Sequence, residues 1–174
     1  MIPTHVARAV DEALAILPAQ MDTPQARVLV FGIGLQESRF EHRRQLIKKA
    51  GVLQPIGPAK SYWQGEVTGG MCSGIRNHDA TRYWVHHLCG VRGVAFTARA
   101  IWNAIEHDDV LAAGCARLLL FSDPKKLPAI DDARSGWNLY ARTWRPGQPH
   151  RETWDACHGE AVRFVTGRER MEML

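Results

Sequence analysis

The stretch TPQARVLVFGIGLQESRF, residues 23–40, decides the fold of this chain. A threonine at position 23 followed by a proline is typical of a helix start, because the hydroxyl caps a free backbone N–H and proline fits the first helical position. The apolar residues that follow recur at helical spacing and predict a buried helix. This helix is expected to end near Glu37, which leaves an acidic side chain at its carboxyl end.

Seven further helices are expected, most of them from apolar residues at helical spacing and one, at 41–50, from a short basic stretch closed by Gly51. The helix at 109–121 is the most apolar of them, so it should lie in the core. Residues 52–74 are rich in glycine, proline and aromatic residues, which fits a small hairpin or a folded loop. The chain should therefore be mainly α, a helical bundle with a small β-hairpin or loop element, and its tail from 167 to 174 should be frayed. The other expected helices cover 4–17, 41–50, 79–89, 94–105, 132–144 and 150–165.

The composition is that of one ordinary globular domain spanning residues 1–174. With 45% hydrophobic residues, a chain of this length buries enough surface to fold without disulfides or a structural metal. Its net charge of +4 and pI near 9.1 suit an acidic partner such as nucleic acid, anionic lipid or bacterial wall polymer. No membrane span is expected, because no apolar run reaches the roughly 20 residues that a bilayer requires.

The cysteines Cys72, Cys89, Cys115 and Cys157 form no C-x-x-C pair, which favours reduced and mostly buried thiols over a disulfide framework. The histidines that precede Cys89 add one compact group of possible metal ligands, but structural zinc sites usually have two close pairs. No metal is therefore expected, and no phosphate-binding glycine motif implies a cofactor. The amino terminus lacks a basic region with an apolar core, which predicts synthesis in a cytoplasm without a signal peptide.

Glu37 is the candidate catalytic residue. Free carbonyl groups at the carboxyl end of a helix carry partial negative charge, and apolar neighbours desolvate a carboxylate, so both effects raise its pKa. A carboxylic acid that keeps its proton near neutral pH can protonate the oxygen of a glycosidic bond as that bond breaks. Arg39 and Arg43 would oppose this shift. The alternative is a glutamate solvated on the surface.

A second candidate region is the loop GPAKSYWQGE, residues 57–66. Loops held by a helical scaffold commonly carry binding groups. Tyr62 and Trp63 offer flat faces for stacking on sugar rings, whereas Gln64 and Glu66 offer hydrogen bonds to hydroxyl and acetamido groups. In the alternative interpretation, the two aromatic residues anchor a hairpin to the core and Glu66 is solvated.

Together these segments resemble a known family. ESRF at 37–40 resembles the Glu-Ser-x-Phe motif of the lysozyme-like superfamily of soluble lytic transglycosylases and goose-type lysozymes, and residues 57–64 are similar to its Gly-Ala-x-Gly-Leu-x-Gln motif. The form WQGE at 63–66 is similar to a branch found in muralytic proteins of bacteriophages. The resemblance covers mainly residues 23–70, with a weaker likeness between WNLY at 137–140 and the family's Tyr-Asn-Ala-Gly segment.

The resemblance implies a lysozyme-like α+β fold, with the hairpin or loop element flanking a cleft, and a role for each matching residue. Glu37 would be the catalytic acid, Ser38 would orient the acid or the substrate, and Gln64 would bind sugar. Tyr140 would line the cleft near the acid, although it also belongs to an aromatic series at helical spacing that is typical of a core. The sequence departs from the family pattern at Ser61, which stands at the place of the second glycine, and in the order of asparagine and tyrosine.

The implied substrate is the peptidoglycan glycan strand, cleaved at the β-1,4 bond between N-acetylmuramic acid and N-acetylglucosamine. A hydrolase would need a second carboxylate, for which Glu66 is the first candidate and Glu41 the second. In a lytic transglycosylase, Glu37 would act as acid and then as base, while the C6 hydroxyl of N-acetylmuramic acid attacks and leaves a 1,6-anhydro end. The sequence does not decide between hydrolysis and transglycosylation. The chain is expected to act as a monomer, either as an endolysin released through a holin pore or as a virion-associated lysin.

A basic nucleic-acid-binding module is the alternative function. Five cations, most of them on the helix expected at 41–50, would form a phosphate-binding stripe together with Arg142, Arg145 and Arg151, which flank an aromatic-rich turn. The same charges suit adsorption to an anionic wall, so nucleic acid is not the expected partner. The five cations are Arg39, Arg43, Arg44, Lys48 and Lys49.

Overall fold

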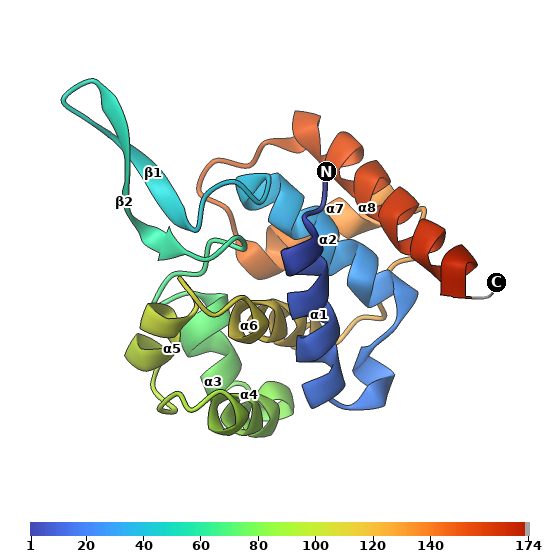
Figure 1. Ribbon diagram of the computed structural model, residues 1–174, viewed down its shortest axis with the longest axis horizontal. Coiled ribbons are helices and arrows are strands. Elements are labelled where there is room, and N and C mark those ends of the chain that lie inside the picture. The colour runs from blue at the N-terminus through green and yellow to red at the C-terminus, as the bar shows by residue number, and fades with distance from the viewer. Residues whose placement is uncertain (173–174) are drawn as a thin grey trace.

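The computed structural model describes residues 1–172, and the side chains of residues 1–167. It is mainly helical with a small antiparallel sheet, as predicted. The helices gather around α6, and the two strands form an arm, residues 44–60, that projects away from them (Figure 1). The elements in chain order are α1 (Thr4–Ile16), η1 (Ala19–Met21), α2 (Pro24–Ser38), β1 (Arg44–Lys49), β2 (Val52–Lys60), η2 (Gly70–Gly74), α3 (Ile75–Asn77), α4 (Asp79–Val91), α5 (Ala98–Ala104), α6 (Asp109–Phe121), α7 (Ala133–Trp144) and α8 (Arg151–Glu172).

Helix α6 forms the centre of the core. Every residue from 110 to 120 is buried, as the nearly continuous apolar sequence of this helix predicts. The side chain of Asp108 caps the helix by accepting a hydrogen bond from the Leu111 N–H at 2.9 Å. Helices α1, α2, α4 and α7 contact α6 and bury their apolar faces against it.

Helix α2 begins and ends where the sequence predicts. The Thr23 hydroxyl accepts a hydrogen bond from the Ala26 N–H at 3.2 Å, and the last helical residue is Ser38. Arg39 then closes the helix in the left-handed conformation, with a φ of 55°. The apolar part of α2 is buried against α8 and α6. Glu37 therefore lies where the helix leaves the core.

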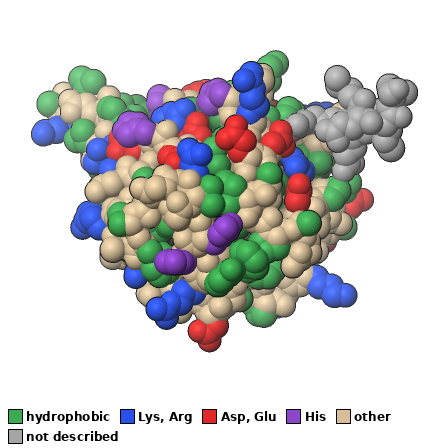
Figure 2. Space-filling view, turned by 60° about the horizontal axis from the view of Figure 1, so that its bottom comes forward, with side chains coloured by type: hydrophobic (Ala, Val, Ile, Leu, Met, Phe, Trp, Pro, Cys, Tyr) green, Lys and Arg blue, Asp and Glu red, His purple; other side chains and the backbone are tan. Residues whose placement is uncertain are grey.

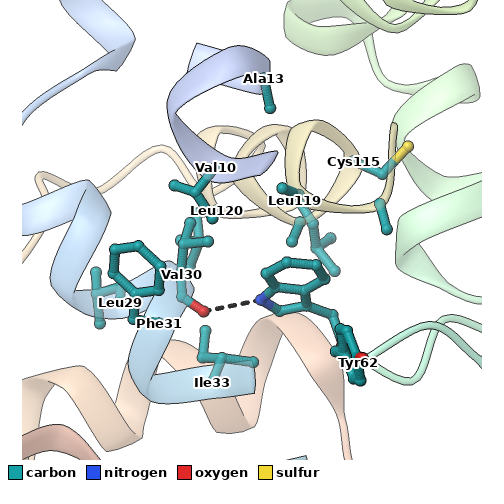
Figure 3. Close-up of a cluster of buried hydrophobic side chains, with 14 of the residues drawn as sticks. Val10, Ala13, Leu29, Val30, Phe31, Ile33, Tyr62, Cys115, Leu119 and Leu120 are labelled. Atoms are coloured by element: carbon teal, nitrogen blue, oxygen red, sulfur yellow. Dashed lines mark hydrogen bonds between the residues drawn. The ribbon is translucent and has the colours of Figure 1, made fainter. Parts of the chain in front are cut away.

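The loop that follows the arm is tied to the core through Trp63. Its side chain has no solvent exposure, and its indole N–H donates a hydrogen bond to the Val30 carbonyl oxygen at 2.8 Å (Figure 3). Leu119 and Leu120 of α6 belong to the same buried cluster. This contact joins the loop to α2 and α6 and fixes the loop beside Glu37's helix.

The segment 41–50, predicted as a basic helix, instead contains strand β1, which pairs with β2. Ala50 and Gly51 connect the strands with φ values of 50° and 83°. Positive values at both positions are typical of the two-residue type I′ turn, which matches the twist of a hairpin. The helix prediction was wrong because it used the composition of 41–50 alone, whereas this turn and the pairing with 52–60 decide the structure.

Three other predicted boundaries differ in detail. Helix α1 ends at Ile16, one residue earlier than predicted. Helix α5 begins only at Ala98, because the Thr97 hydroxyl accepts a hydrogen bond from a backbone N–H and starts the helix there. The prediction of a frayed tail from 167 is wrong up to residue 172, where α8 ends, and its last two residues lie outside the described part of the chain.

The four cysteines are buried and free, which confirms the prediction of reduced core thiols. Burial raises the pKa of Cys72 to about 12 and that of Cys89 to about 11. Both thiols therefore keep their protons at neutral pH and are poor nucleophiles. Within residues 1–172, no helix has the length and hydropathy needed to cross a membrane.

Candidate active site

A cleft of about 1190 Å³ opens beside the carboxyl end of α2. Its lining comes from α2, the base of the arm, the loop after β2, α7 and the segment leading into α8. The volume suits an extended ligand rather than a small one. The cleft brings together four residues predicted from sequence, namely Glu37, Gln64, Glu66 and Tyr140.

Glu37 lies half-buried in the last turn of α2 and on the wall of the cleft. Burial raises the pKa of Glu37 to about 7, and a hydrogen bond from Tyr140 opposes part of this shift. Arg43, which was expected to oppose it, pairs with Asp109 instead. Desolvation is thus the main cause of the shift. At neutral pH a large fraction of this carboxyl group keeps the proton that a general acid must donate.

Tyr140 is both a core residue and a residue of the cleft. Its ring is buried and stacks on the indole of Trp154, with centroids 5.5 Å apart and an interplanar angle of 8°. Its hydroxyl donates a hydrogen bond to Oε1 of Glu37 at 2.7 Å. The aromatic series at helical spacing therefore packs in the core, as its period predicts, and also holds one hydroxyl against the acid.

Ser38 joins the end of α2 to the loop after the arm. Its hydroxyl donates a hydrogen bond to the Tyr62 carbonyl oxygen at 2.8 Å and accepts one from the Phe40 N–H at 3.1 Å. These contacts fix the turn that follows Glu37 and the loop that faces it. Ser38 contacts backbone groups on both sides and does not line the cleft.

Gln64 lines the cleft from that loop. Its side-chain amide donates a hydrogen bond to the Ser61 carbonyl oxygen at 2.8 Å, which fixes the side chain. Within the described part of the chain its side-chain oxygen has no partner, so it is free to accept a hydrogen bond from a ligand. Ser61 itself has a φ of 68°, a value that favours glycine. Ser61 stands where the family motif has its second glycine, so the backbone at this position has the conformation that a glycine would favour.

The motifs noted in the sequence thus meet across one cleft. No protein-family model, curated protein or solved structure matches this chain.

The structure does not place Tyr62 and Trp63 where sugars could stack on them. Both side chains are buried in the core, and neither lines the cleft. The Tyr62 hydroxyl lies 3.3 Å from Nε2 of His5, and its ring contacts Phe40 edge to face. The two aromatic residues anchor the loop to the core, which agrees with the alternative interpretation. The stacking prediction was wrong because nothing in the local sequence distinguishes an anchor from a stacking platform.

Trp144, a member of the same aromatic series at helical spacing as Tyr140, also lines the cleft. It is the last residue of α7 and is half-buried. Its indole N–H donates a hydrogen bond to the Trp63 carbonyl oxygen at 3.0 Å, which leaves the ring fixed at the wall. Helical spacing predicted its side of the helix, but not that α7 ends at the cleft.

The candidates for a second carboxylate lie in different places. Glu66 is exposed and lines the cleft, whereas Glu41 is exposed and does not. Asp123, which was not predicted, also lines the cleft. The Arg142 guanidinium hydrogen-bonds Asp123 at 2.6 Å and lowers the pKa of that carboxyl. Of these carboxylates, Glu66 is the one that lines the cleft without a guanidinium partner.

The five cations of the alternative function are divided between two parts of the molecule. Arg39 closes α2, and Lys48 and Lys49 lie on the projecting arm. Arg43 and Arg44 face acidic residues at the base of the arm. These charges form no single helical stripe, contrary to the prediction. Among the described residues, no three side chains of His, Cys, Asp or Glu come together as metal ligands.

Proposed function

We propose that this protein cleaves the β-1,4 bond between N-acetylmuramic acid and N-acetylglucosamine in peptidoglycan, with Glu37 as general acid. The observation that carries the proposal is a half-buried glutamate whose pKa is raised to about 7, on the wall of a cleft that also presents Gln64. Glycosidases need such a carboxylic acid to protonate the leaving oxygen. The resemblance of 37–40 and 57–64 to the lysozyme-like superfamily supports the same substrate.

The hydrogen bond from Tyr140 supports the proton transfer. When Glu37 gives its proton to the glycosidic oxygen, the carboxylate that remains keeps the 2.7 Å hydrogen bond from this hydroxyl. A hydrogen bond to a carboxylate is stronger than one to a neutral acid, so it stabilises the product of the transfer. Burial raises the pKa of Tyr140 well above its ordinary value, so the phenol remains the donor.

The sugar cation that develops in this step can be captured in two ways. In hydrolysis, Glu66 is the carboxylate of the cleft that would activate a water molecule or stabilise the cation. In transglycosylation, the Glu37 carboxylate takes the proton of the C6 hydroxyl of N-acetylmuramic acid, and this hydroxyl closes a 1,6-anhydro ring. The two products differ by the mass of one water molecule.

Digestion of purified peptidoglycan by wild type and by Glu37→Gln tests the proposal. The variant should lose activity by a factor of about 10²–10⁴, because glutamine has no acidic proton to donate. Glu41→Gln is the matched control, since it removes an exposed carboxylate outside the cleft and should keep normal activity. Mass spectrometry of the wild-type products distinguishes hydrolysis from transglycosylation.

Near-normal activity of Glu37→Gln would contradict the proposal. An inactive wild-type protein that binds DNA with an affinity falling steeply at higher salt would favour the nucleic-acid module instead. Equal losses in Glu37→Gln and Glu41→Gln would point to a general effect of removing negative charge, and would also count against Glu37 as the acid.

A further inference from the structure

The arm exposes large hydrophobic side chains that do not belong to the core. Ile47, Val52, Leu53 and Ile56 are 39%, 61%, 61% and 44% exposed, and they account for half of the large exposed hydrophobic side chains of the described chain. The arm stands away from the helices (Figure 1), and these four side chains are exposed to solvent. Soluble surfaces seldom gather apolar side chains in this way without a partner.

The same arm is basic and has no acidic residue. From residue 42 to residue 65 the sequence has five Lys and Arg and no Asp or Glu. Figure 2 shows hydrophobic and basic side chains together where the arm projects at the upper left. Lys48 and Lys49 form no ion pair in the part of the chain that the structure describes. The remaining three are paired at the base, where Arg43 faces Asp109 and both Arg44 and Lys60 face Glu106.

We propose that the outer half of the arm, residues 47–56, binds the surface of an anionic lipid bilayer. Aliphatic side chains at its end can enter the boundary between headgroups and acyl chains. Lysines beside them can bury their methylene stems while the ammonium groups reach lipid phosphates.

Two other occupants fit the arm less well. Residues 41–61 contain no Phe, Tyr or Trp, so the arm offers no ring on which a nucleic-acid base could stack. Pairing of the arm with that of a second copy would place two uncompensated lysine pairs on one small sheet, where like charges repel. A lipid surface satisfies the apolar side chains and the charges together.

Cosedimentation with vesicles tests the proposal without peptidoglycan, so its outcome is independent of the proposed enzyme activity. Wild type should bind vesicles of phosphatidylglycerol and phosphatidylcholine, and should bind pure phosphatidylcholine only weakly. Lys48→Gln/Lys49→Gln should lower the partition constant by about 25-fold, since each lysine near an anionic surface is worth about fivefold. Lys125→Gln/Lys126→Gln removes an equal charge from another exposed lysine pair and should keep wild-type binding.

The apolar part of the contact has its own pair of variants. Val52→Ser/Leu53→Ser should lose most of the binding, whereas Val91→Ser, at an exposed valine of α4, should not. A probe attached to Leu53→Cys gives a second measurement, because the four native cysteines are buried and should not react. Its emission should rise and shift to the blue with anionic vesicles alone.

Several outcomes would overturn the proposal. These are equal binding of wild type to both kinds of vesicle, unchanged binding by both arm variants, or no response of the probe at position 53. Self-association in the absence of lipid that both arm variants abolish, with no vesicle binding, would assign the arm to a second copy instead. Arm-dependent binding to purified peptidoglycan but not to vesicles would assign it to the wall.

Discussion

At the level of single residues, the pKa of Glu37 reflects two opposing effects. Burial at the cleft wall disfavours the carboxylate, and the hydroxyl of Tyr140 favours it. The result lies near neutrality, where a group can both give and take a proton. Changing either effect should move the pKa in a direction that can be measured.

Tyr140→Phe removes the hydroxyl that donates to Oε1 of Glu37. Because this hydrogen bond lowers the pKa of Glu37, its loss should raise that pKa further, by about one unit. The alkaline limb of the pH profile of kcat/KM on peptidoglycan should move to higher pH accordingly. Tyr83→Phe, at an exposed tyrosine of α4, should leave the profile unchanged. A shift of the limb to lower pH would contradict the assignment.

Glu37→Gln should also change how stability depends on pH. The folded pKa of about 7 lies above the ordinary value of 4.5. The stability that the protonated wild-type side chain contributes is therefore fully present below the ordinary value, and it is lost as the pH rises through 7. Glutamine has no such dependence. Relative to wild type, the variant should gain about 2–3 kcal/mol in the free energy of unfolding between roughly pH 4 and pH 8.

Urea unfolding of both proteins at the two pH values measures this gain. Glu41→Gln serves as the reference, because it makes the same substitution at a side chain that is exposed to solvent. A difference between Glu37→Gln and wild type that stays constant with pH would mean that Glu37 is not desolvated in solution.

At the level of elements, the end of α2 depends on a glycine. A Cβ added at Gly34 would collide with the ring of Phe40 and come within 3.2 Å of the Trp63 indole nitrogen. The chain turns back after Glu37 so that this ring covers the last turn of the helix. The close approach of the Phe40 ring and the Trp63 indole to Gly34 therefore helps to hold the end of α2, with Glu37, against the loop.

Gly34→Ala should destabilise the protein by about 1–3 kcal/mol, because the added methyl group overpacks this contact. Gly32→Ala is the matched control on the same helix. Its Cβ would lie 3.7 Å or more from its neighbours, so it should be neutral or stabilise by up to about 1 kcal/mol through helix propensity. Thermal or urea unfolding measures both variants. Equal effects of the two substitutions would show that the contact with Phe40 is not tight.

At the level of the whole molecule, the arm and the helical body differ in what holds them. The body packs around α6, whose residues 110–120 are all buried. The arm has two short strands and gains most of its order from pairing with itself and from ion pairs at its base. A hairpin without a hydrophobic face to pack on is only marginally stable in water.

Hydrogen exchange should therefore separate the two parts. Backbone amides of residues 44–60 should exchange through local opening, about 10³-fold or more faster than those of α6, which require global unfolding. Mass spectrometry of peptides from 44–60 and 109–121 measures the difference. Protection of the arm equal to that of α6 would mean that the arm docks on the body in solution.

The elements that the sequence predicts well are those whose signals are local. The Thr23 cap, the carboxyl end of α2 and the buried run of α6 each depend on neighbouring residues. The helix predicted at 41–50 failed because pairing with 52–60 through a tight turn outweighs local composition. The interpretation of Trp63 as a sugar platform failed for a similar reason, since burial depends on α2 and α6 rather than on the loop.

The sequence by itself determined where Glu37 lies, at the end of an apolar helix, because capping and hydrophobic period act over a few residues. Only the tertiary structure decided that Glu37 is desolvated and that its partner is Tyr140, 103 positions away. It alone placed Trp144 at the cleft and the lysines of the arm in solvent. Burial and pKa are properties of a residue's surroundings, and those surroundings come from segments that are distant in the chain.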